Sequence, residues 1–258
     1  MTEYIVISLF ALVASGLTFF SGFGLGTILL PVFALFFPIE LAIILTAIVH
    51  FLTNVFKLTL TGRSAQWHIV LRFGLPAILA ALLGAYLLTL ISDIEPLYSY
   101  SMFGKTFYIT VVKLTVGFLL CAFSLFDLIP KLTKLSFDQK YMPLGGLLSG
   151  FFGGLSGNQG ALRTAFLIRA KLSKEEFIAT GVVIAVLIDI SRLVIYSTTI
   201  IKLRDMIDVM LLVLATFAAF IGAIIGNIML KKITIKALQL MVGIMLFIFS
   251  ILLGLGIV

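Results

Sequence analysis

The sequence predicts an all-α polytopic membrane protein built from two inverted-topology repeats of five helical segments each. Of its 258 residues, 62% are hydrophobic, 11% are charged and 24 are Phe. Soluble domains carry about 25% charged residues, so a soluble fold is excluded. Two further observations, the placement of the basic residues and a pair of glycine-rich breaks, predict how the segments thread through the membrane.

Ten helical segments follow from the apolar runs, because crossing the hydrocarbon core takes about 20 apolar residues. The run that begins at Ile5 is longer than a signal-peptide core and no cleavage pattern follows it, so we expect the N-terminus to be retained. Several paired segments around the glycine-rich breaks are too short to cross alone. The expected segments are 4–21, 26–37, 40–60, 68–91, 106–128, 142–155, 160–170, 175–198, 207–230 and 236–257.

Lysine and arginine predict the orientation of the chain. Twelve of the 18 lie in the regions 57–72, 127–141, 169–176 and 231–236, whereas three lie in the regions on the opposite side. Cytoplasmic loops carry the excess of basic residues, so we expect these four regions to be cytoplasmic and both termini to lie outside. The basic residues do not interleave with aromatic side chains, so the net charge of +7 reflects topology rather than nucleic-acid binding.

The two glycine-rich breaks read GLTFFSGFGLGTILLP at Gly16–Pro31 and GFFGGLSGNQGALR at Gly150–Arg163. The orientation requires the first pair of segments to begin and end outside, and the sixth and seventh to begin and end in the cytoplasm. Each pair is therefore expected to form a hairpin, and the two hairpins enter from opposite faces. Irregular backbone at membrane depth is tolerated only where it lines a cavity or is buried in protein, so the breaks are the first candidates for a substrate site.

Shared features of the two halves predict an internal repeat. The stretch Val116–Phe126, VGFLLCAFSLF, matches Val242–Leu252, VGIMLFIFSIL, at the V-G and F-S pairs. We therefore expect residues 1–130 and 131–258 to form two inverted repeats, a recurrent plan of secondary transporters. The other matched positions are Gly84 with Gly222, and Asn54 and Lys57 with Asp189 and Arg192.

Polar side chains at the second break predict an anion-binding site. Arg163 starts a short apolar helix, where a guanidinium in lipid costs about 2.5–3.5 kcal/mol, and helix N-termini favour negative charge. Ser156, Asn158 and Gln159 add neutral donors, which suit an oxyanion when combined with one charge. The alternatives are that Arg163 only bonds the carbonyls of a facing segment and that the neutral side chains only satisfy the loop backbone.

The first break is poorer in donors. Gly24 and Leu25 stand where the second break has Asn158 and Gln159. We therefore expect the first hairpin to supply close backbone and shape, and the second hairpin to supply most of the anion chemistry. The expected substrate-binding residues are Ser21, Gly24, Thr27, Ser156, Asn158, Gln159 and Arg163.

Polar residues also lie within segments three and eight, and we take His50, Asn54, Asp189 and Arg192 as candidates for ion coupling. Asp189 and Arg192 share one helix face, which predicts an intrahelical ion pair; the alternatives are a proton carrier or a second anion ligand. His50 has no Cys, Asp or Glu partner in sequence, so we expect a packed or hydrogen-bonded histidine, with a proton relay as the alternative. Lys57 is expected to snorkel to the cytoplasmic surface.

The sequence contains no P-loop, no G-x-S-x-G, no H-E-x-x-H and no paired carboxylates suited to acid-base chemistry, so we expect neither an enzyme nor an ATP-driven pump. The single Cys121 cannot form an internal disulfide, and metal sites need clustered ligands. We therefore expect no metal and no cofactor. The expected partners are a small anionic substrate, the lipid bilayer and a coupling ion such as H⁺. The sequence leaves open whether the chain forms a homo-oligomer.

These residues resemble the TauE/SafE sulfite-exporter family of bacterial inner-membrane permeases. The resemblance covers nearly the whole chain and is carried by SGFGLGTILLP at Ser21–Pro31, GGLSGNQGALR at Gly153–Arg163, the basic loops and the closing V-G…F-S helices. One departure is that the family's second repeat usually has a proline after the glycine motif, where this chain has Ala165 and Phe166.

The resemblance implies a multi-pass protein of the cell membrane that exports sulfite, organosulfonates or related small anions as a secondary transporter. We expect alternating access around a mid-membrane site between the two hairpins. Two alternatives stay open at this point. The chain would be an anion channel if the break acted as a filter, and a cation permease if Asp189 rather than Arg163 faced the cavity.

Overall fold

The computed structural model describes residues 1–258 apart from 20–23, 103, 130, 133–134 and 230–234, and apart from the side chains of 229 and 235–239. Its helices are α1 (Thr2–Leu17), α2 (Leu25–Ala34), α3 (Ile39–Thr61), α4 (Trp67–Ser92), α5 (Val111–Leu128), α6 (Met142–Ser156), α7 (Gly160–Leu167), α8 (Lys174–Lys202), α9 (Val209–Met229) and α10 (Ile235–Gly254). Its strands are β1 (Tyr98–Met102) and β2 (Lys105–Ile109), and its short 3-10 turns are η1 (Gly62–Ser64), η2 (Gln139–Tyr141) and η3 (Arg204–Met206).

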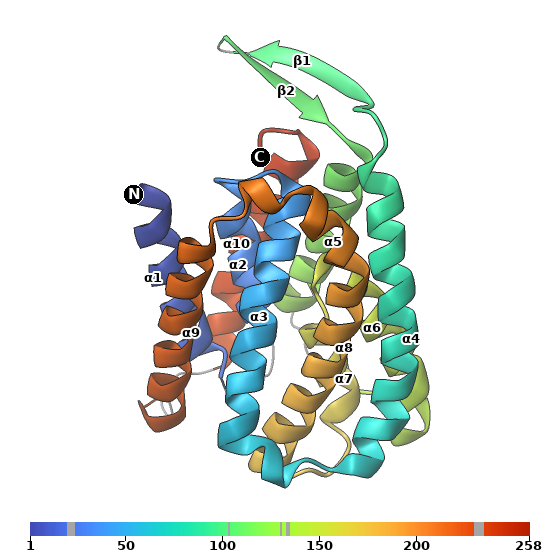
Figure 1. Ribbon diagram of the computed structural model, residues 1–258. Helices are drawn as coiled ribbons and strands as arrows, with labels where there is room; N and C mark the ends of the chain where they lie inside the picture. The colour runs from blue at the N-terminus through green and yellow to red at the C-terminus, as the bar shows by residue number, and fades with distance from the viewer. Residues whose placement is uncertain (20–23, 103, 130, 133–134, 230–234) are drawn as a thin grey trace.

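Five of the described helices are long and apolar enough to cross a membrane, namely α3 with η1, α4, α5, α8 and α9. This finding agrees with the prediction of a helical polytopic membrane protein. The helices on either side of the two glycine-rich breaks are shorter, as the sequence predicts. Both termini and the strands lie toward one end of the molecule, and the α3–α4 connection lies at the opposite end (Figure 1).

The strand pair β1–β2 corrects one predicted segment. A helix was expected from residue 106, but 105–109 forms β2, which pairs antiparallel with β1 in the register Tyr98↔Ile109. The stretch KTFYIT is rich in aromatic and β-branched residues, which favour strands, and Gly104 supplies the positive φ of 74° in the connection. Helix α5 begins at Val111 instead, where Thr110 Oγ1 accepts the Lys113 N–H at 3.2 Å.

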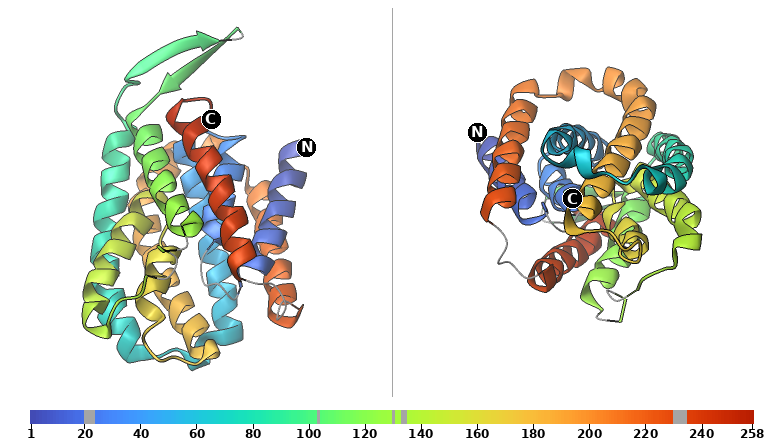
Figure 2. Two further views of the ribbon diagram at one scale, coloured as in Figure 1. Left: turned by 180° about the vertical axis from the view of Figure 1, so that it is seen from behind. Right: turned by 90° about the horizontal axis from the view of Figure 1, so that it is seen from below.

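Glycines let helix α6 pack directly on the backbone of α4. A Cβ built on Gly146, Gly150 or Gly154 would lie 2.1 Å from a carbonyl oxygen of α4, a distance that no side chain tolerates. The pair α1–α9 repeats this arrangement, because a Cβ on Gly222 would lie 2.1 Å from the Leu12 carbonyl oxygen. Small residues at interfaces of this kind let membrane helices approach closely. The two pairs lie on different sides of the bundle (Figure 2).

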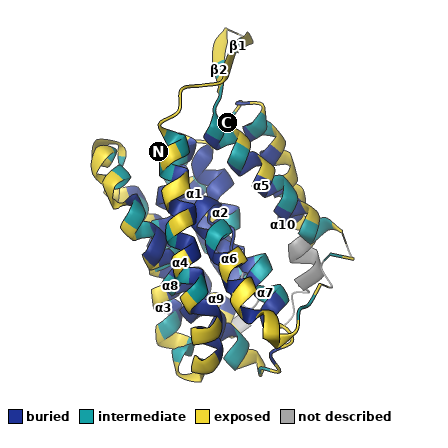
Figure 3. Cartoon of the chain, turned by 90° about the vertical axis from the view of Figure 1, so that its right-hand side faces the viewer, coloured by how far each residue is buried: buried dark blue, intermediate teal, exposed yellow. Residues whose placement is uncertain are grey.

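Helices α3 and α8 pack against each other inside the bundle. Buried residues concentrate on the inner faces, whereas the outer faces carry exposed large apolar side chains such as Leu79 and Phe118 (Figure 3). Large exposed apolar surface of this extent is rare on soluble monomers. The exposure of large apolar side chains on the outer faces therefore fits a chain whose outer surface contacts lipid and whose polar side chains include several in the interior.

Asp208 fixes the connection between α8 and α9. Its carboxylate accepts a hydrogen bond from the Tyr4 hydroxyl of α1, and its Oδ1 accepts the Leu211 N–H at 3.1 Å, so it caps α9. Both bonds lower the pKa of Asp208 below its usual range, and the bond from Tyr4 has the larger effect. This connection therefore ties the start of α9 to α1.

Candidate functional site

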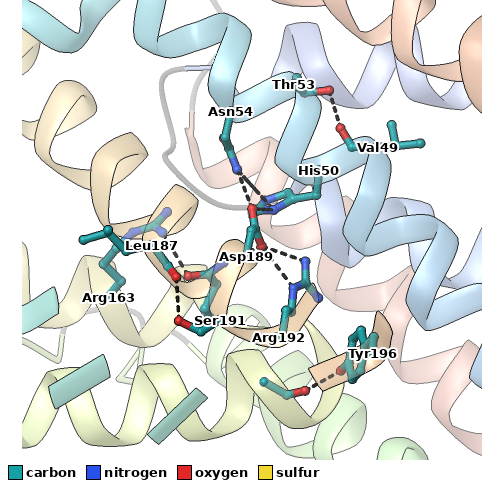
Figure 4. Close-up of polar contacts among 12 residues, drawn as sticks. Val49, His50, Thr53, Asn54, Arg163, Leu187, Asp189, Ser191, Arg192 and Tyr196 are labelled. Atoms are coloured by element: carbon teal, nitrogen blue, oxygen red, sulfur yellow. Dashed lines mark hydrogen bonds and ion pairs between the residues drawn. The ribbon is translucent and has the colours of Figure 1, made fainter. Parts of the chain in front are cut away.

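The interface between α3 and α8 holds a cluster of buried polar side chains (Figure 4). Asp189 of α8 is fully buried, and its Oδ2 lies 2.7 Å from His50 Nδ1 of α3. Asn54, one turn further along α3, donates from Nδ2 to the same oxygen at 3.2 Å. This contact agrees with the expectation of a packed or hydrogen-bonded His50. The sequence did not indicate its partner, because Asp189 comes from a different helix.

The predicted ion pair between Asp189 and Arg192 is confirmed. Arg192 Nε and Nη2 donate to Asp189 Oδ1 at 3.1 and 2.8 Å, and the Arg192 side chain is only 1% exposed. Its remaining nitrogen, Nη1, is buried and has no hydrogen-bond partner among the described residues. A Cβ built on Gly157 would lie 2.8 Å from this atom. The unused donor of Arg192 therefore faces the second glycine-rich break.

The second break is a tight loop between α6 and α7. Gly157 ends α6 with a φ of 80°, a left-handed conformation that glycine adopts without strain. Ser149 of α6 donates from Oγ to the carbonyl oxygen of Gln159 at 2.9 Å and so holds the loop against its own helix. The loop is buried, with Asn158 6% and Gln159 2% exposed. At Gly160 the N-terminus of α7 begins, and a helix N-terminus presents unpaired N–H groups.

Hydrogen bonds connect this loop to the cluster on α8. Gln159 donates from Nε2 to Asp189 Oδ1 at 3.4 Å, and its Oε1 accepts from Arg163 Nη1 at 3.4 Å. Arg163 is 4% exposed. The structure thus brings Gln159, Arg163, Asp189 and Arg192 into one connected group. It does not bring Ser156 into that group, since the Ser156 hydroxyl donates to the carbonyl of Phe152 and accepts from Asn158.

The first break comes close to this group through its backbone. A Cβ built on Gly26, at the start of α2, would lie 3.4 Å from the His50 ring and 3.8 Å from the Gly157 carbonyl oxygen. Gly24 precedes α2 with a φ of 113°. Thr27 lines a small cavity together with Asn158 of the second break. Ser21 lies outside the described residues.

Lys57 of α3 is buried, which corrects the expectation that it snorkels to the cytoplasmic surface. The side chain is 5% exposed, and its Nζ lies 5.6 Å from the centre of the Phe19 ring. Helix α3 continues to Thr61 and is followed by η1, and Phe19 covers Lys57 after the end of α1. These two features keep the ammonium group inside the protein, where a cation–π contact partly replaces water.

The charges of the buried side chains do not balance. Among the described residues, Lys57, Arg163 and Arg192 are buried cations, whereas Asp189 is the one buried carboxylate. Burying a charge is costly unless an opposite charge or several hydrogen bonds compensate for it. The α3–α8 interface and the second break therefore hold an excess of positive charge that an anion would offset.

Two larger cavities lie at opposite ends of α3 and α8. One of about 470 Å³ adjoins the end of α3, η1 and the start of α8, and it reaches Phe19. The other, of about 350 Å³, adjoins the start of α3 and the end of α8 and is lined by charged residues that include Glu40 and Lys202. The buried polar cluster, which includes His50 and Asp189, lies on the same two helices at positions between those that line the two cavities.

Sequence reasoning found most of these residues but missed how they meet. It placed Asn54 with Lys57 and Asp189 with Arg192 at matching positions of two repeats, and that equivalence could have indicated that α3 and α8 cross. It also missed Tyr196 of α8, whose hydroxyl donates to the carbonyl of Gly154 and ties α8 to the end of α6. No periodic pattern marks such side-chain to backbone bonds.

A family model described as sulfite exporter TauE/SafE matches residues 7–253, which is nearly the whole chain. No curated protein and no solved structure matches.

Proposed function

Because the chain belongs to the TauE/SafE sulfite exporter family, we propose that it is a secondary transporter that exports small sulfur-containing anions, such as sulfite or an organosulfonate. The observation that carries this proposal is the excess of positive charge at the second break. Arg192 Nη1 is the one buried guanidinium nitrogen without a hydrogen-bond partner among the described residues, and it faces Gly157. A buried donor of this kind is costly unless a ligand uses it.

The substrate would bind at the break between α6 and α7. Arg192 and Arg163 would supply charge, and Gln159 and Asn158 would supply amide donors, while the N-terminus of α7 would add backbone N–H groups. Gly26 and Gly24 would bring the backbone of the first break close to the same place. Discontinuous helices that point their N-termini at an anionic group are a known solution in transporters.

The carboxylate of Asp189 is better suited to organising these donors than to binding a cation. Its Oδ1 accepts from Arg192 and Gln159, and its Oδ2 accepts from Asn54 and lies beside His50. A carboxylate with both oxygens occupied has little capacity left for a transported cation. This arrangement favours the anion carrier over the cation permease.

We place the protein in the bacterial inner membrane with both termini outside, because the basic regions would then face the cytoplasm.

The proposed repeats, residues 1–130 and 131–258, are supported by equivalent contacts. Helix α1 packs on α9 as α6 packs on α4, and α3 packs on α8. Gly84 and Gly222, the matched glycines, each approach a carbonyl oxygen of the partner helix. Rocking of one repeat on the other would open the two larger cavities to the site alternately.

Exchange of labelled sulfite or methanesulfonate in proteoliposomes tests this function. We expect uptake into anion-loaded vesicles, and accumulation against the anion gradient when a proton gradient is imposed. An anion channel would give flux without accumulation. Absence of exchange of either anion by the wild-type protein would refute the proposal.

Two substitutions test the charge argument. Arg163→Gln removes one buried cation of the proposed anion site, and we expect it to lower exchange about 10- to 100-fold, since a lost charged contact is worth about 1.5–3 kcal/mol. Lys57→Met removes a buried cation that has no proposed contact with the anion, so we expect a smaller loss of exchange in the same direction. Arg169→Gln is the matched control, because Arg169 is exposed and pairs with Asp138 at the surface. Thermal melting in detergent separates loss of binding from loss of folding. Unchanged exchange in Arg163→Gln would exclude Arg163 from the anion site.

A further inference from the structure

Asp127 is a carboxylate that the proposed anion site does not use. It lies in the last turn of α5 and is half-buried. With Thr27 of the first break and Asn158 of the second, it lines a cavity of about 10 Å³, about the space of one water molecule. The remaining walls are Phe123, Gly160, Ala161 and Leu246. Asp127 therefore stands where the two glycine-rich breaks meet.

No charged neighbour neutralises Asp127 in the described part of the chain. It makes no hydrogen bond or ion pair with a described residue, and on the side of α10 it packs on Gly243, where a Cβ would lie 3.2 Å from the Asp127 Cβ. Helices α2 and α6 carry no titratable side chain. Helix α7 carries Arg163, which bonds Gln159. Of the lysines, Lys131, which follows α5, is exposed, and Lys236 lies on α10, with its side chain outside the described residues.

We propose that Asp127 is the proton-binding group that couples anion movement to proton movement, an inference that rests on the proposed anion transport. An ionised Asp127 would repel an anion that enters between the two breaks, whereas a neutral carboxylic acid would not. A proton delivered by a hydronium ion converts the carboxylate to the acid and releases water. Anion binding and Asp127 protonation then favour each other by the same factor. The anion and the proton therefore move in the same direction, and net export requires the outward driving force on the anion to exceed an inward proton gradient.

The sign of the pH dependence follows from this linkage. Exchange by the wild-type protein is expected to fall as pH rises, because a smaller fraction of the protein has Asp127 protonated. Methanesulfonate is the suitable probe, since it keeps one negative charge over the whole range and any pH dependence then belongs to the protein. Exchange is measured at equal internal and external pH, between pH 5.5 and 8.5, so that no gradient drives the flux.

We expect wild-type exchange to fall about tenfold across this range, and Asp127→Asn exchange to be nearly independent of pH. Asp127→Glu should restore the pH dependence. Asp138→Asn is the matched control, because Asp138 is an exposed carboxylate at the surface pair with Arg169, and it should behave as wild type. A wild-type pH profile in Asp127→Asn would overturn the inference.

The two proposals fail in distinguishable ways. If the wild-type protein exchanges neither methanesulfonate nor sulfite, the transport function itself fails, and the coupling role fails with it. If exchange is present, only the coupling role is at stake. If Asp127→Asn fails to fold, the coupling role is tested by measuring proton uptake by the wild-type protein when it binds the anion. Adding methanesulfonate to purified protein in weak buffer should raise the pH, and no change in pH would overturn the role of Asp127.

Discussion

Replacement of Arg192 by lysine is expected to lower anion exchange about 10- to 100-fold while the protein still folds, because a charged hydrogen bond contributes about 1.5–3 kcal/mol. The guanidinium uses Nε and Nη2 on Asp189 and leaves Nη1 at the second break. A lysine has a single nitrogen, so it can bond Asp189 or reach Gly157, but not both. Arg192→Lys therefore keeps the charge and removes the donor for the anion.

Arg192→Ala is expected to have a larger and different effect. It leaves Asp189 buried without its main counter-ion, and breaking a buried ion pair in this way costs about 3–5 kcal/mol of stability. Exchange and thermal melting in detergent are measured on the same preparations. Arg169→Lys, a change at the exposed pair with Asp138, should alter neither quantity. Wild-type exchange in Arg192→Lys would show that Nη1 is not a ligand of the transported anion.

Gly150→Ala is expected to destabilise the protein by about 3 kcal/mol or to prevent folding, because overpacking of a tight interface costs up to about this much. The new Cβ would lie 2.1 Å from the Ala77 carbonyl oxygen, which is backbone and cannot rotate away. Helix α6 would have to separate from α4 along its length. Since α6 carries the second break at its end, exchange is expected to fall together with stability.

Gly254→Ala is the matched control for this prediction. Gly254 ends α10, and a Cβ placed there meets no atom within 4 Å. Alanine is the better helix former by about 1 kcal/mol at most, so stability should stay equal or rise slightly. Fluorescence-detected size exclusion after heating compares the two variants in detergent. Equal melting temperatures for Gly150→Ala and the wild type would contradict the close α4–α6 contact.

Much of the architecture was predictable because a bilayer imposes simple rules on sequence. Apolar length predicts helices, and glycine-rich interruptions with Asn158, Gln159 and Arg163 predict breaks, since lipid does not satisfy an irregular backbone. The ion pair of Asp189 and Arg192 was predictable because helix geometry alone brings positions three apart together. The placement of basic residues predicts an orientation, and both termini do lie toward one end of the molecule.

The sequence was uninformative for two reasons. A local pattern does not reveal contacts with distant parts of the chain, and a strand next to a long apolar run was read as part of the following helix. His50 was expected to be packed or hydrogen-bonded, but the sequence did not indicate that its partner would be Asp189 of α8. Lys57 was expected at the surface, yet Phe19 covers it. Residues 105–109 directly precede the long apolar run of α5, yet they form a strand because Gly104 allows the chain to reverse and β1 supplies the pairing partner.

The sequence by itself determined the class of protein, the two breaks and the donors that the second break offers, because these depend on composition and on neighbours along one helix. Only the tertiary structure decided which buried charges share a site. The crossing of α3 and α8 joins His50 and Asn54 to Asp189, and the fold of the α6–α7 loop brings Gly157 to the unused nitrogen of Arg192. Such contacts depend on helix packing, which no one-dimensional pattern of apolar and polar residues specifies.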